Sequence, residues 1–501
     1  MLSHRSHPPQ RDTQGIAPKS GTAFRLAELS RSLMPLMAQH DILTRFAATS
    51  EGGLCVADAT RNPTNAYKIR GALARVSAAQ SEGKKIVVTA SAGNHGAGVA
   101  CAAQALGMEA RVYVPESAPQ VKVNTIRGFG ATVLQEGSTF DESLCYARRD
   151  QHLLAGRGAL VHPFDDLLVA AGQGTIGLEM LAHIEQLRKE RAFDKVRIFL
   201  PVGGGGLLAG VASVMKMLWD PRHPHPEIVG VIDESAPAAL LGVLFGRPVA
   251  AAPDTIADGT KVALIGDTFL SVSHLVDYMM LVRHDSIVSA MRRHERETFT
   301  KLEGAGALAL AGEAQARKHK LFSHPERTLS IALITGRNID PCLFHEAVTG
   351  EARLDIASHA RQAFDVRIPE REGELLHFLQ TVKSFNIASL TYKQRPGAAA
   401  ARLQAEFEVP RDALGSLQRA IFADFPGSHR LEEGEEMLYP IGEPVAQEYH
   451  DELIALDDKP GAFLECVERL SKARAFGSVG FLFYRKPPYA GKTAQVVLGL
   501  D

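Results

Sequence analysis

The sequence predicts an α/β protein whose long N-terminal part folds around parallel sheets and whose C-terminal part is a smaller α+β region. Between about Leu54 and Asn338, short runs rich in Val and Ile alternate with Ala-rich or amphipathic runs, which is the pattern of strands joined by helices. After about Gly350 the composition changes, and one order of strand, helix, strand and strand occurs twice, about ninety residues apart.

The N-terminal part is expected to contain strands at regular intervals, each followed by a helix. The expected strands are Lys85–Ala90, Ala110–Val114, Ala131–Leu134, Val196–Val202, Ile228–Ile232 and Leu329–Ile334. The expected helices between them include Gly98–Leu106, Val121–Arg127 and Leu207–Leu218. Such alternation predicts parallel sheets covered on both faces, in which ligands bind at the carboxyl ends of the strands.

The C-terminal part is expected to hold two copies of a β-α-β-β unit, each with a glycine before its helix. The first copy has Phe364–Pro369, Glu374–Phe385, Ile387–Tyr392 and Ala405–Val409, and the second has Glu452–Leu456, Ala462–Ala473, Val479–Tyr484 and Gln495–Leu498. This order is most of a ferredoxin-like unit, which either binds a ligand or serves packing and dimerisation. We expect a disordered tail over 1–20, one domain over 21–350, a helical connector over 351–362, and repeats over 363–440 and 450–501.

Composition excludes several classes of function. The 55 basic and 57 acidic side chains nearly cancel, so charge gives no reason to expect nucleic acid or a membrane as partner. The five cysteines form no CxxC pair, so the sequence indicates neither a disulfide framework nor a metal site, and a reducing compartment such as the cytoplasm fits. No apolar run reaches 18 residues, so we expect no membrane span. An alternative for the polar first 20 residues is an organelle transit peptide.

A lysine within a distinctive segment is the first candidate for chemistry. Asn62-Pro-Thr-Asn-Ala-Tyr-Lys-Ile-Arg-Gly71 places Lys68 directly after the aromatic Tyr67. In a dry pocket the pKa of a lysine falls, and its amine becomes a nucleophile able to form a Schiff base.

Two glycine-containing turns accompany that lysine. Ser91-Ala-Gly-Asn-His-Gly96 joins an expected strand to an expected helix, where glycines let a ligand approach the backbone and free N–H groups attract an anion. In the alternative interpretation, Ser91 and Asn94 only cap the helix. The run Gly203–Gly206 also follows a strand and opens a helix, which is typical of a phosphate site. It also satisfies a loose dinucleotide pattern, with Asp233 ending the next strand.

A reactive lysine, a phosphate site and a carboxylate-binding turn together fit the chemistry of pyridoxal phosphate. The motifs resemble those of the fold type II (tryptophan-synthase-β-like) pyridoxal-phosphate enzymes, and among them the biosynthetic threonine dehydratases. The matching motifs are Ala66–Ala72, Thr89–His95, Lys122-Val123 with Arg127–Gly130, Ala171–Thr175, Pro201–Leu207, Gly306–Gly312 and Thr335–Asn338. The resemblance is good over about 62–340 and looser over the two repeats, which resemble that family's ACT-like regulatory units.

The resemblance implies a role for each motif residue. Lys68 would hold the cofactor as a Schiff base and then take the Cα proton, with Tyr67 packed near the cofactor. Asn94 would bind the ring hydroxyl, Thr335 would face the ring nitrogen, and Glu303 would have a supporting role. The phosphate would lie on Gly203, Gly204, Gly205 and Gly206, and the substrate carboxylate would lie among Ser91, Gly93, Asn94 and His95. The implied reaction converts threonine to 2-oxobutanoate and ammonia in a homotetramer, with isoleucine or valine as effector.

The sequence also departs from the family pattern. Ala57–Thr60 stands where the family has Lys-Arg-Glu-Asp, Ala66 replaces a serine, and Arg337 replaces a small residue. Alternatives therefore stay open: the same fold acting on serine or another β-substituted amino acid such as diaminopropionate, a catalytically decayed amino-acid sensor, or a dinucleotide oxidoreductase.

Overall fold

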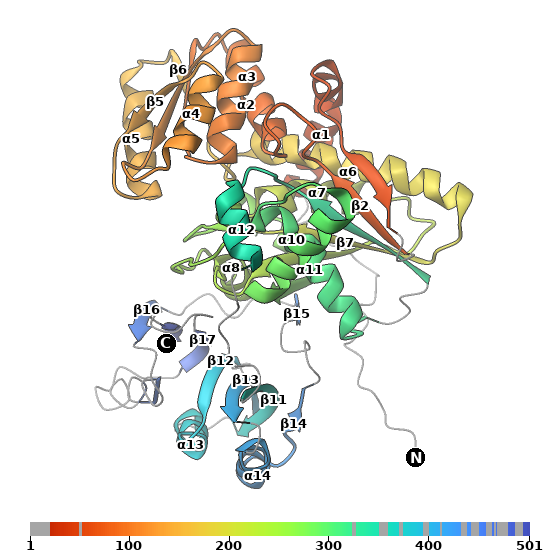
Figure 1. Cartoon of the computed structure of the whole chain (residues 1–501), viewed down its shortest axis with the longest axis vertical. Coiled ribbons are helices and arrows are strands. Elements are labelled where there is room, and N and C mark those ends of the chain that lie inside the picture. Colours follow the sequence, from red (N-terminus) through yellow and green to blue (C-terminus); the bar gives the residue numbers. More distant parts are fainter. Residues whose placement is uncertain are drawn as a thin grey trace.

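Three sheets organise the chain in the computed structural model (Figure 1). It describes residues 21–49, 53–322, 327–349, 359–369, 374–393, 400–410, 413–431, 438–441, 450–456, 463–464, 467, 479–485 and 494–500. The expected tail and most of the expected connector lie outside these residues. The first domain contains two parallel-sheet subdomains, and the C-terminal region is built on an antiparallel sheet, which confirms the expected fold class.

The larger subdomain is a seven-stranded sheet with helices on both faces. In spatial order its strands are β1 (Arg45–Ala48), β2 (Leu54–Asp58), β10 (Thr328–Ile334), β7 (Lys195–Pro201), β8 (Glu227–Asp233), β9 (Tyr278–Val282) and β15 (Leu438–Pro440). The five inner strands are parallel, and the two edge strands are antiparallel to their neighbours. One face packs on α1 (Gly21–Gln39), α6 (Leu167–Glu190), α7 (Gly206–Met217) and α8 (Ala238–Phe245). The other face packs on α10 (His284–Thr298), α11 (Gly304–Lys318) and α12 (Pro341–Thr349). Short helices at Asp258–Thr260 (η1), Asp267–Leu270 (α9) and Ser273–Leu275 (η2) complete it.

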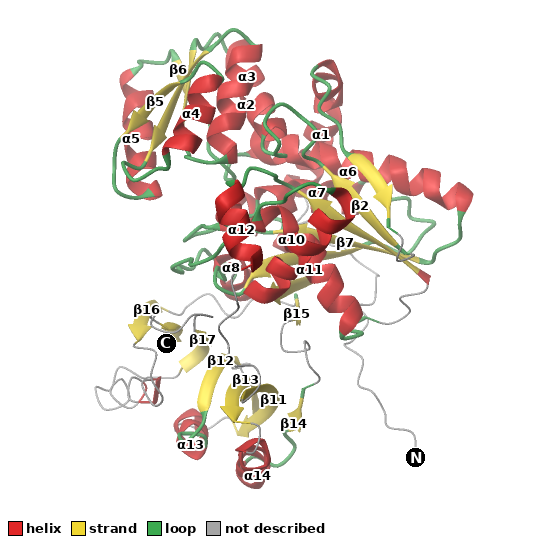
Figure 2. Ribbon diagram, in the orientation of Figure 1, coloured by secondary structure: helices red, strands yellow, loops and turns green. Residues whose placement is uncertain are grey.

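The smaller subdomain is a four-stranded parallel sheet inserted between β2 and β7. Its strands are β5 (Thr132–Gln135), β4 (Glu109–Val114), β3 (Ile86–Ala90) and β6 (Gly158–Leu160). Its helices are α2 (Ile69–Ser81), α3 (Asn94–Ala105), α4 (Gln120–Gly128) and α5 (Phe140–Leu153). Figure 2 shows them around the sheet. Every residue of β3 is buried, as expected for a central parallel strand.

In the C-terminal region the two repeats form one seven-stranded antiparallel sheet. Its order is β14 (His429–Arg430), β11 (His359–Pro369), β13 (Ala400–Pro410), β12 (Asn386–Lys393), β17 (Val479–Arg485), β18 (Ala494–Leu500) and β16 (His450–Leu456). The helices α13 (Glu374–Thr381) and α14 (Leu414–Asp424) belong to the first repeat. The repeats meet where β12 pairs with β17.

Two expectations for this region need comment. The connector was expected to be helical to residue 362, which is wrong for its last four residues. They belong to β11, which pairs with β13 from His359 onward. Of the expected second-repeat helix, only 463, 464 and 467 are described, and they are helical.

Helix α6 is long and apolar enough, by length and composition, to cross a membrane. It packs on α1, α2 and α7, however, and its most hydrophobic stretch is 61% buried inside the protein. Its burial identifies α6 as a core helix of the large subdomain.

A buried ion pair joins α2 to α6. The side chain of Arg70 is fully buried, and its guanidinium donates to both carboxylate oxygens of Glu179 at 3.1 and 2.9 Å. It also donates to the hydroxyls of Thr175 and Thr44, at 2.8 and 3.1 Å. The segment that carries Lys68 is thus held against the core of the large subdomain.

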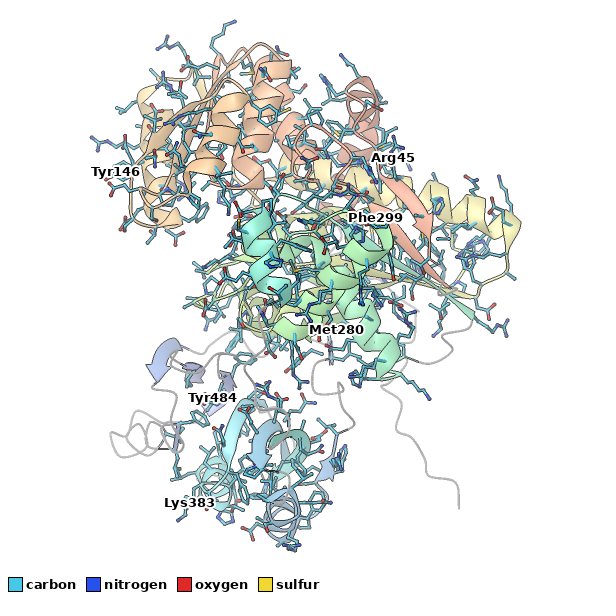
Figure 3. All side chains as sticks on the ribbon, viewed as in Figure 1. Arg45, Tyr146, Met280, Phe299, Lys383 and Tyr484 are labelled. Carbon is cyan, nitrogen blue, oxygen red and sulfur yellow. The ribbon has the colours of Figure 1, made fainter. Side chains whose placement is uncertain are left out.

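Among the contacts of the described residues, one strand pairing and one ion pair join the C-terminal region to the edge of the large sheet. Strand β15 pairs with β9, where Leu438 lies opposite Met280, a residue that Figure 3 shows on the side facing the C-terminal region. Just after β9, Arg283 forms an ion pair with the buried Glu406 of β13. Both contacts join the two-subdomain part of the chain to the repeats.

Candidate active site

The loop before α2 is fixed by the side chain of Asn62. Its amide nitrogen donates to the carbonyls of Ala59 and Ala66, both at 3.1 Å, and its amide oxygen accepts from the backbone and hydroxyl of Thr64. The backbone N–H of Tyr67 donates to the carbonyl of Thr335 at 3.0 Å. Lys68, which directly precedes α2, is therefore held beside the carboxyl end of β10.

The Lys68 amine is partly buried where it meets the cavity. It donates to the carbonyl of Pro163 at 2.9 Å, and its nitrogen lies 5.4 Å from the centre of the Tyr67 ring. Burial lowers the pKa of Lys68 to about 8, an effect that the negative charge of Glu303 partly offsets. Burial also raises the pKa of the Tyr67 hydroxyl, which stays neutral. About a tenth of the Lys68 amine is therefore unprotonated and nucleophilic at pH 7, far more than for a lysine of ordinary pKa.

The four-glycine run forms a bend that no side chain could occupy. Gly205 has φ +91°, and a Cβ there would lie 2.4 Å from the Phe269 ring. A Cβ on Gly204 would lie 2.2 Å from the Phe164 ring, and one on Gly203 would lie 2.8 Å from Thr260 Cα. Helix α7 begins at Gly206, so its free N–H groups lie at this bend. The geometry suits one phosphate group.

No side chain caps helix α3 at the turn that follows β3. Gly93 is the N-cap residue and no side-chain hydrogen bond caps the helix, so the capping interpretation is wrong. The Ser91 hydroxyl accepts from the backbone N–H of Gly93 at 3.2 Å, and the Asn94 amide reaches Glu303 instead. A Cβ on Gly96 would lie 2.2 Å from the carbonyl of Ser91, which requires glycine there.

His95 is a neutral, buried histidine. It is 2% exposed, and burial lowers its pKa to about 3. Its Nε2 lies 3.1 Å from the carbonyl of Val161. Since a carbonyl only accepts, Nε2 carries the proton and Nδ1 keeps its lone pair. The side chain of His95 thus cannot donate through Nδ1 to a carboxylate, although its backbone N–H at the start of α3 can.

Thr335 directly follows β10, and Glu303 directly precedes α11. The Thr335 hydroxyl donates to the carbonyl of Ala305 at 3.1 Å and is 2% exposed. Burial raises the pKa of Glu303 to about 7, and the hydrogen bond from Asn94 opposes that rise. A Cβ on Gly336 would lie 1.8 Å from a Glu303 carboxylate oxygen, so this glycine makes room for Glu303.

All the site residues expected from the sequence line one cavity of about 2170 Å³, which continues toward the C-terminal region. These residues are Tyr67, Lys68, Ser91, Gly93, Asn94, His95, Gly203, Gly204, Gly205, Gly206 and Thr335. Pro163, Phe164 and Asn338 also line it, and no function was expected of them. The first two follow β6, so the rule that ligands bind at strand ends could have indicated them.

Two departures from the family pattern contact each other. Arg337 donates to the Asp58 carboxylate at 2.6 Å, although 279 positions separate them, and Arg61 approaches the same oxygen at 3.0 Å. The other Asp58 oxygen accepts from the backbone and hydroxyl of Thr60. The altered stretch at the end of β2 and the altered residue after β10 therefore form one ion pair beside the Lys68 loop.

The residues present fit pyridoxal phosphate better than a dinucleotide. The glycine bend is closed by the Phe164 and Phe269 rings and suits a single phosphate, while a nucleophilic lysine lines the same cavity. Asp233, the acid of the dinucleotide pattern, is 1% exposed and already accepts from the Thr255 hydroxyl and the Ser235 N–H. Within the described part of the chain, no group of three or more His, Cys, Asp or Glu side chains could hold a metal ion.

Comparison with known proteins agrees with this geometry. Residues 42–333 match the model of the family described as pyridoxal-phosphate dependent enzyme. The chain is 33% identical over 339 residues to the biosynthetic L-threonine dehydratase IlvA of Haemophilus influenzae, covering 66% of this chain and 62% of the relative. It is 41% identical over 281 residues to an L-threonine ammonia-lyase of Geobacter sulfurreducens, covering 55% and 65%.

The chain thus spans less than two thirds of the length of both relatives. Among solved structures, processed threonine deaminase isoform 2 from Solanum lycopersicum matches with a TM-score of 0.56 and 32% identity, covering 64% of this chain and 88% of that one. The expected resemblance is confirmed, and the chain belongs to the family of pyridoxal-phosphate-dependent enzymes with fold type II.

Proposed function

We propose that this chain deaminates L-threonine to 2-oxobutanoate and ammonia, the first step of isoleucine biosynthesis. The observation that carries the proposal is the shared cavity, in which a partly buried lysine of lowered pKa and a four-glycine bend lie together. The relatives named threonine dehydratase or threonine ammonia-lyase support this choice of substrate.

Lys68 is the residue that carries the chemistry. Pyridoxal phosphate, when bound, supplies the electron sink that makes the Cα–H of an amino acid acidic. The Lys68 amine would hold the cofactor covalently and, once the substrate amine has displaced it, take the proton from Cα. Its pKa of about 8 suits that task, because general bases work best when their pKa is near the working pH.

Other residues would orient the cofactor. Gly203 to Gly206 and the start of α7 would bind its phosphate, and Asn94 would donate to its ring hydroxyl. Thr335 would face the ring nitrogen. Because a hydroxyl is neutral, that nitrogen would stay unprotonated, which moderates the electron sink and favours β-elimination. Tyr67 would pack beside the ring.

The start of α3 would bind the substrate carboxylate. Backbone N–H groups of Asn94 and His95, with the Ser91 hydroxyl, would supply the donors, and Gly93 would let the carboxylate approach the backbone. The His95 ring would contribute shape rather than charge, since its proton is committed to Val161.

An assay of ammonia release over a panel of amino acids tests the proposal. We expect threonine to be the best substrate and serine to be poorer by about 10-fold in kcat/KM, since one methyl group in an apolar pocket is worth roughly that much. A preference for serine or diaminopropionate would instead support the alternative substrate. A yellow protein that releases no ammonia from any amino acid would support the decayed sensor.

We further propose that the repeats are ACT-like units that regulate the enzyme through isoleucine and valine. The ion pair of Arg283 with Glu406 and the pairing of β15 with β9 support it, because they join the repeats to the catalytic sheet. Isoleucine or valine should change the rate of threonine deamination, and isoleucine should lower it. In Glu406→Gln the half-inhibitory isoleucine concentration should change about 10-fold, a typical allosteric coupling. If neither amino acid changes the activity of the wild-type chain, the effector proposal fails.

Domain limits of 21–350, 359–440 and 450–501, with the first repeat starting where β11 starts, are part of this proposal, as are a cytoplasmic location and a homotetramer. The thiols of Cys55, Cys101, Cys145 and Cys342 are free, which supports a reducing compartment.

A further inference from the structure

Three hydrogen bonds link residues from three different segments around Asn94. Asn338 donates from Nδ2 to the carbonyl of Thr64 and to the Asn94 amide oxygen, in both cases at 2.7 Å. Asn94 in turn donates from Nδ2 to a Glu303 carboxylate oxygen at 2.7 Å. Glu303 is 8% exposed, whereas Asn338 faces the open cavity.

The groups at the two ends of this series of hydrogen bonds fix which atom donates in each bond. The Thr64 carbonyl can only accept, so the Asn338 amide must turn its nitrogen toward it. The same nitrogen has a second hydrogen, which goes to the oxygen of the Asn94 amide. At the other end the Glu303 oxygen accepts from the Asn94 nitrogen, a hydrogen bond that favours the ionised carboxylate, and an ionised carboxylate can only accept. The two ends therefore demand the same orientation of the Asn94 amide.

This leaves one hydrogen on the Asn94 nitrogen. The amide NH₂ carries two, and one is used by Glu303. Asn94 lines the cavity that also contains Lys68. Resting on the function proposed above, we propose that Glu303 and Asn338 are positioning residues, which hold the Asn94 amide so that its second N–H is offered to the ring hydroxyl of pyridoxal phosphate. A flipped amide would offer an acceptor there instead.

The proposal predicts a spectroscopic effect. A donor at the ring oxygen favours its ionised form, which absorbs at longer wavelength than the protonated form. Glu303→Met keeps the size of the side chain but removes the acceptor. It should shift absorbance from the long- to the short-wavelength band and weaken pyridoxal phosphate binding by roughly 10-fold, as expected for the loss of a hydrogen bond to a charged group. Glu303→Gln keeps one acceptor and should retain most of the long-wavelength band.

Asn338 supplies an independent, directional test. Asn338→Asp has the same shape but offers only acceptors, so it should repel the Asn94 oxygen and favour the flipped amide. Asn338→Ala only removes the restraint. The loss of the long-wavelength band should therefore be larger in Asn338→Asp than in Asn338→Ala.

The experiment records the absorption spectrum and the pyridoxal phosphate dissociation constant for the wild-type chain and these four variants. A Glu303→Gln protein that behaves like Glu303→Met would overturn the orienting role, because charge rather than acceptor direction would then matter. Equal spectra for Asn338→Asp and Asn338→Ala would overturn it as well. A wild-type chain that shows no cofactor band would overturn the proposed function and this inference together. The variant results above would overturn this inference alone.

Discussion

Replacing Lys68 with alanine should lower threonine deamination by about 10⁴-fold or more, because one change removes both the covalent attachment of the cofactor and the base that takes the Cα proton. The amine lies in the same cavity as the glycine bend. Among the described residues, the other lysines that line this cavity are Lys122 and Lys261. The variant should also lose the absorption band of a lysine-bound cofactor at about 410 nm. Steady-state kinetics and an absorption spectrum measure the two effects.

The matched control is Lys189→Ala, which removes an exposed lysine from the C-terminal end of α6. Its activity and spectrum should equal those of the wild-type chain. Far-ultraviolet circular dichroism of both variants shows whether each is folded. A folded Lys68→Ala protein with wild-type turnover would contradict the role assigned to this amine.

Replacing Arg70 with alanine should lower the free energy of unfolding by about 3–5 kcal/mol, the usual cost of leaving one partner of a buried ion pair behind. The stranded Glu179 carboxylate would keep the N–H of Thr44 as a donor, at 2.9 Å, but would lose both guanidinium hydrogen bonds. The double variant Arg70→Met, Glu179→Leu should be far less destabilised than the sum of the single changes, since it leaves no buried charge.

Urea unfolding followed by circular dichroism measures these differences. Arg222→Ala serves as the control, because its ion pair with Asp220 lies at the surface and the arginine side chain is 82% exposed. Its unfolding midpoint should not move. A midpoint for Arg70→Ala equal to that of Arg222→Ala would show that the buried pair does not stabilise the fold.

The sequence predicted the parts of the site whose signal is local. A strand followed by four glycines and a helix is a contiguous pattern, and so is a lysine after an aromatic residue in a loop. Each has a physical meaning that does not depend on distant residues: the bend admits only glycine, and a helix start attracts an anion. For that reason three of the five inner strands of the large sheet, β10, β7 and β8, and the cavity-lining motifs were found without coordinates, whereas β2 and β9 were not predicted.

Contacts between distant segments could not be predicted in this way. Asp58 and Arg337 each looked like an isolated departure, and only the parallel pairing of β2 with β10 brings them together. Similarly, Gly336 appears unremarkable in sequence until Glu303 is seen to fill the space that a Cβ would need. The start of β11 at His359 was also missed, because its partner strand lies some forty positions further along the chain.

The central claim is that the Lys68 amine is the atom bonded to the cofactor. Borohydride reduction makes a lysine–cofactor bond permanent, and mass spectrometry of the digested protein then locates it. The account predicts one pyridoxyl group per chain, on the peptide that contains Lys68. A group on any other lysine, or none on a chain loaded with pyridoxal phosphate, would contradict it.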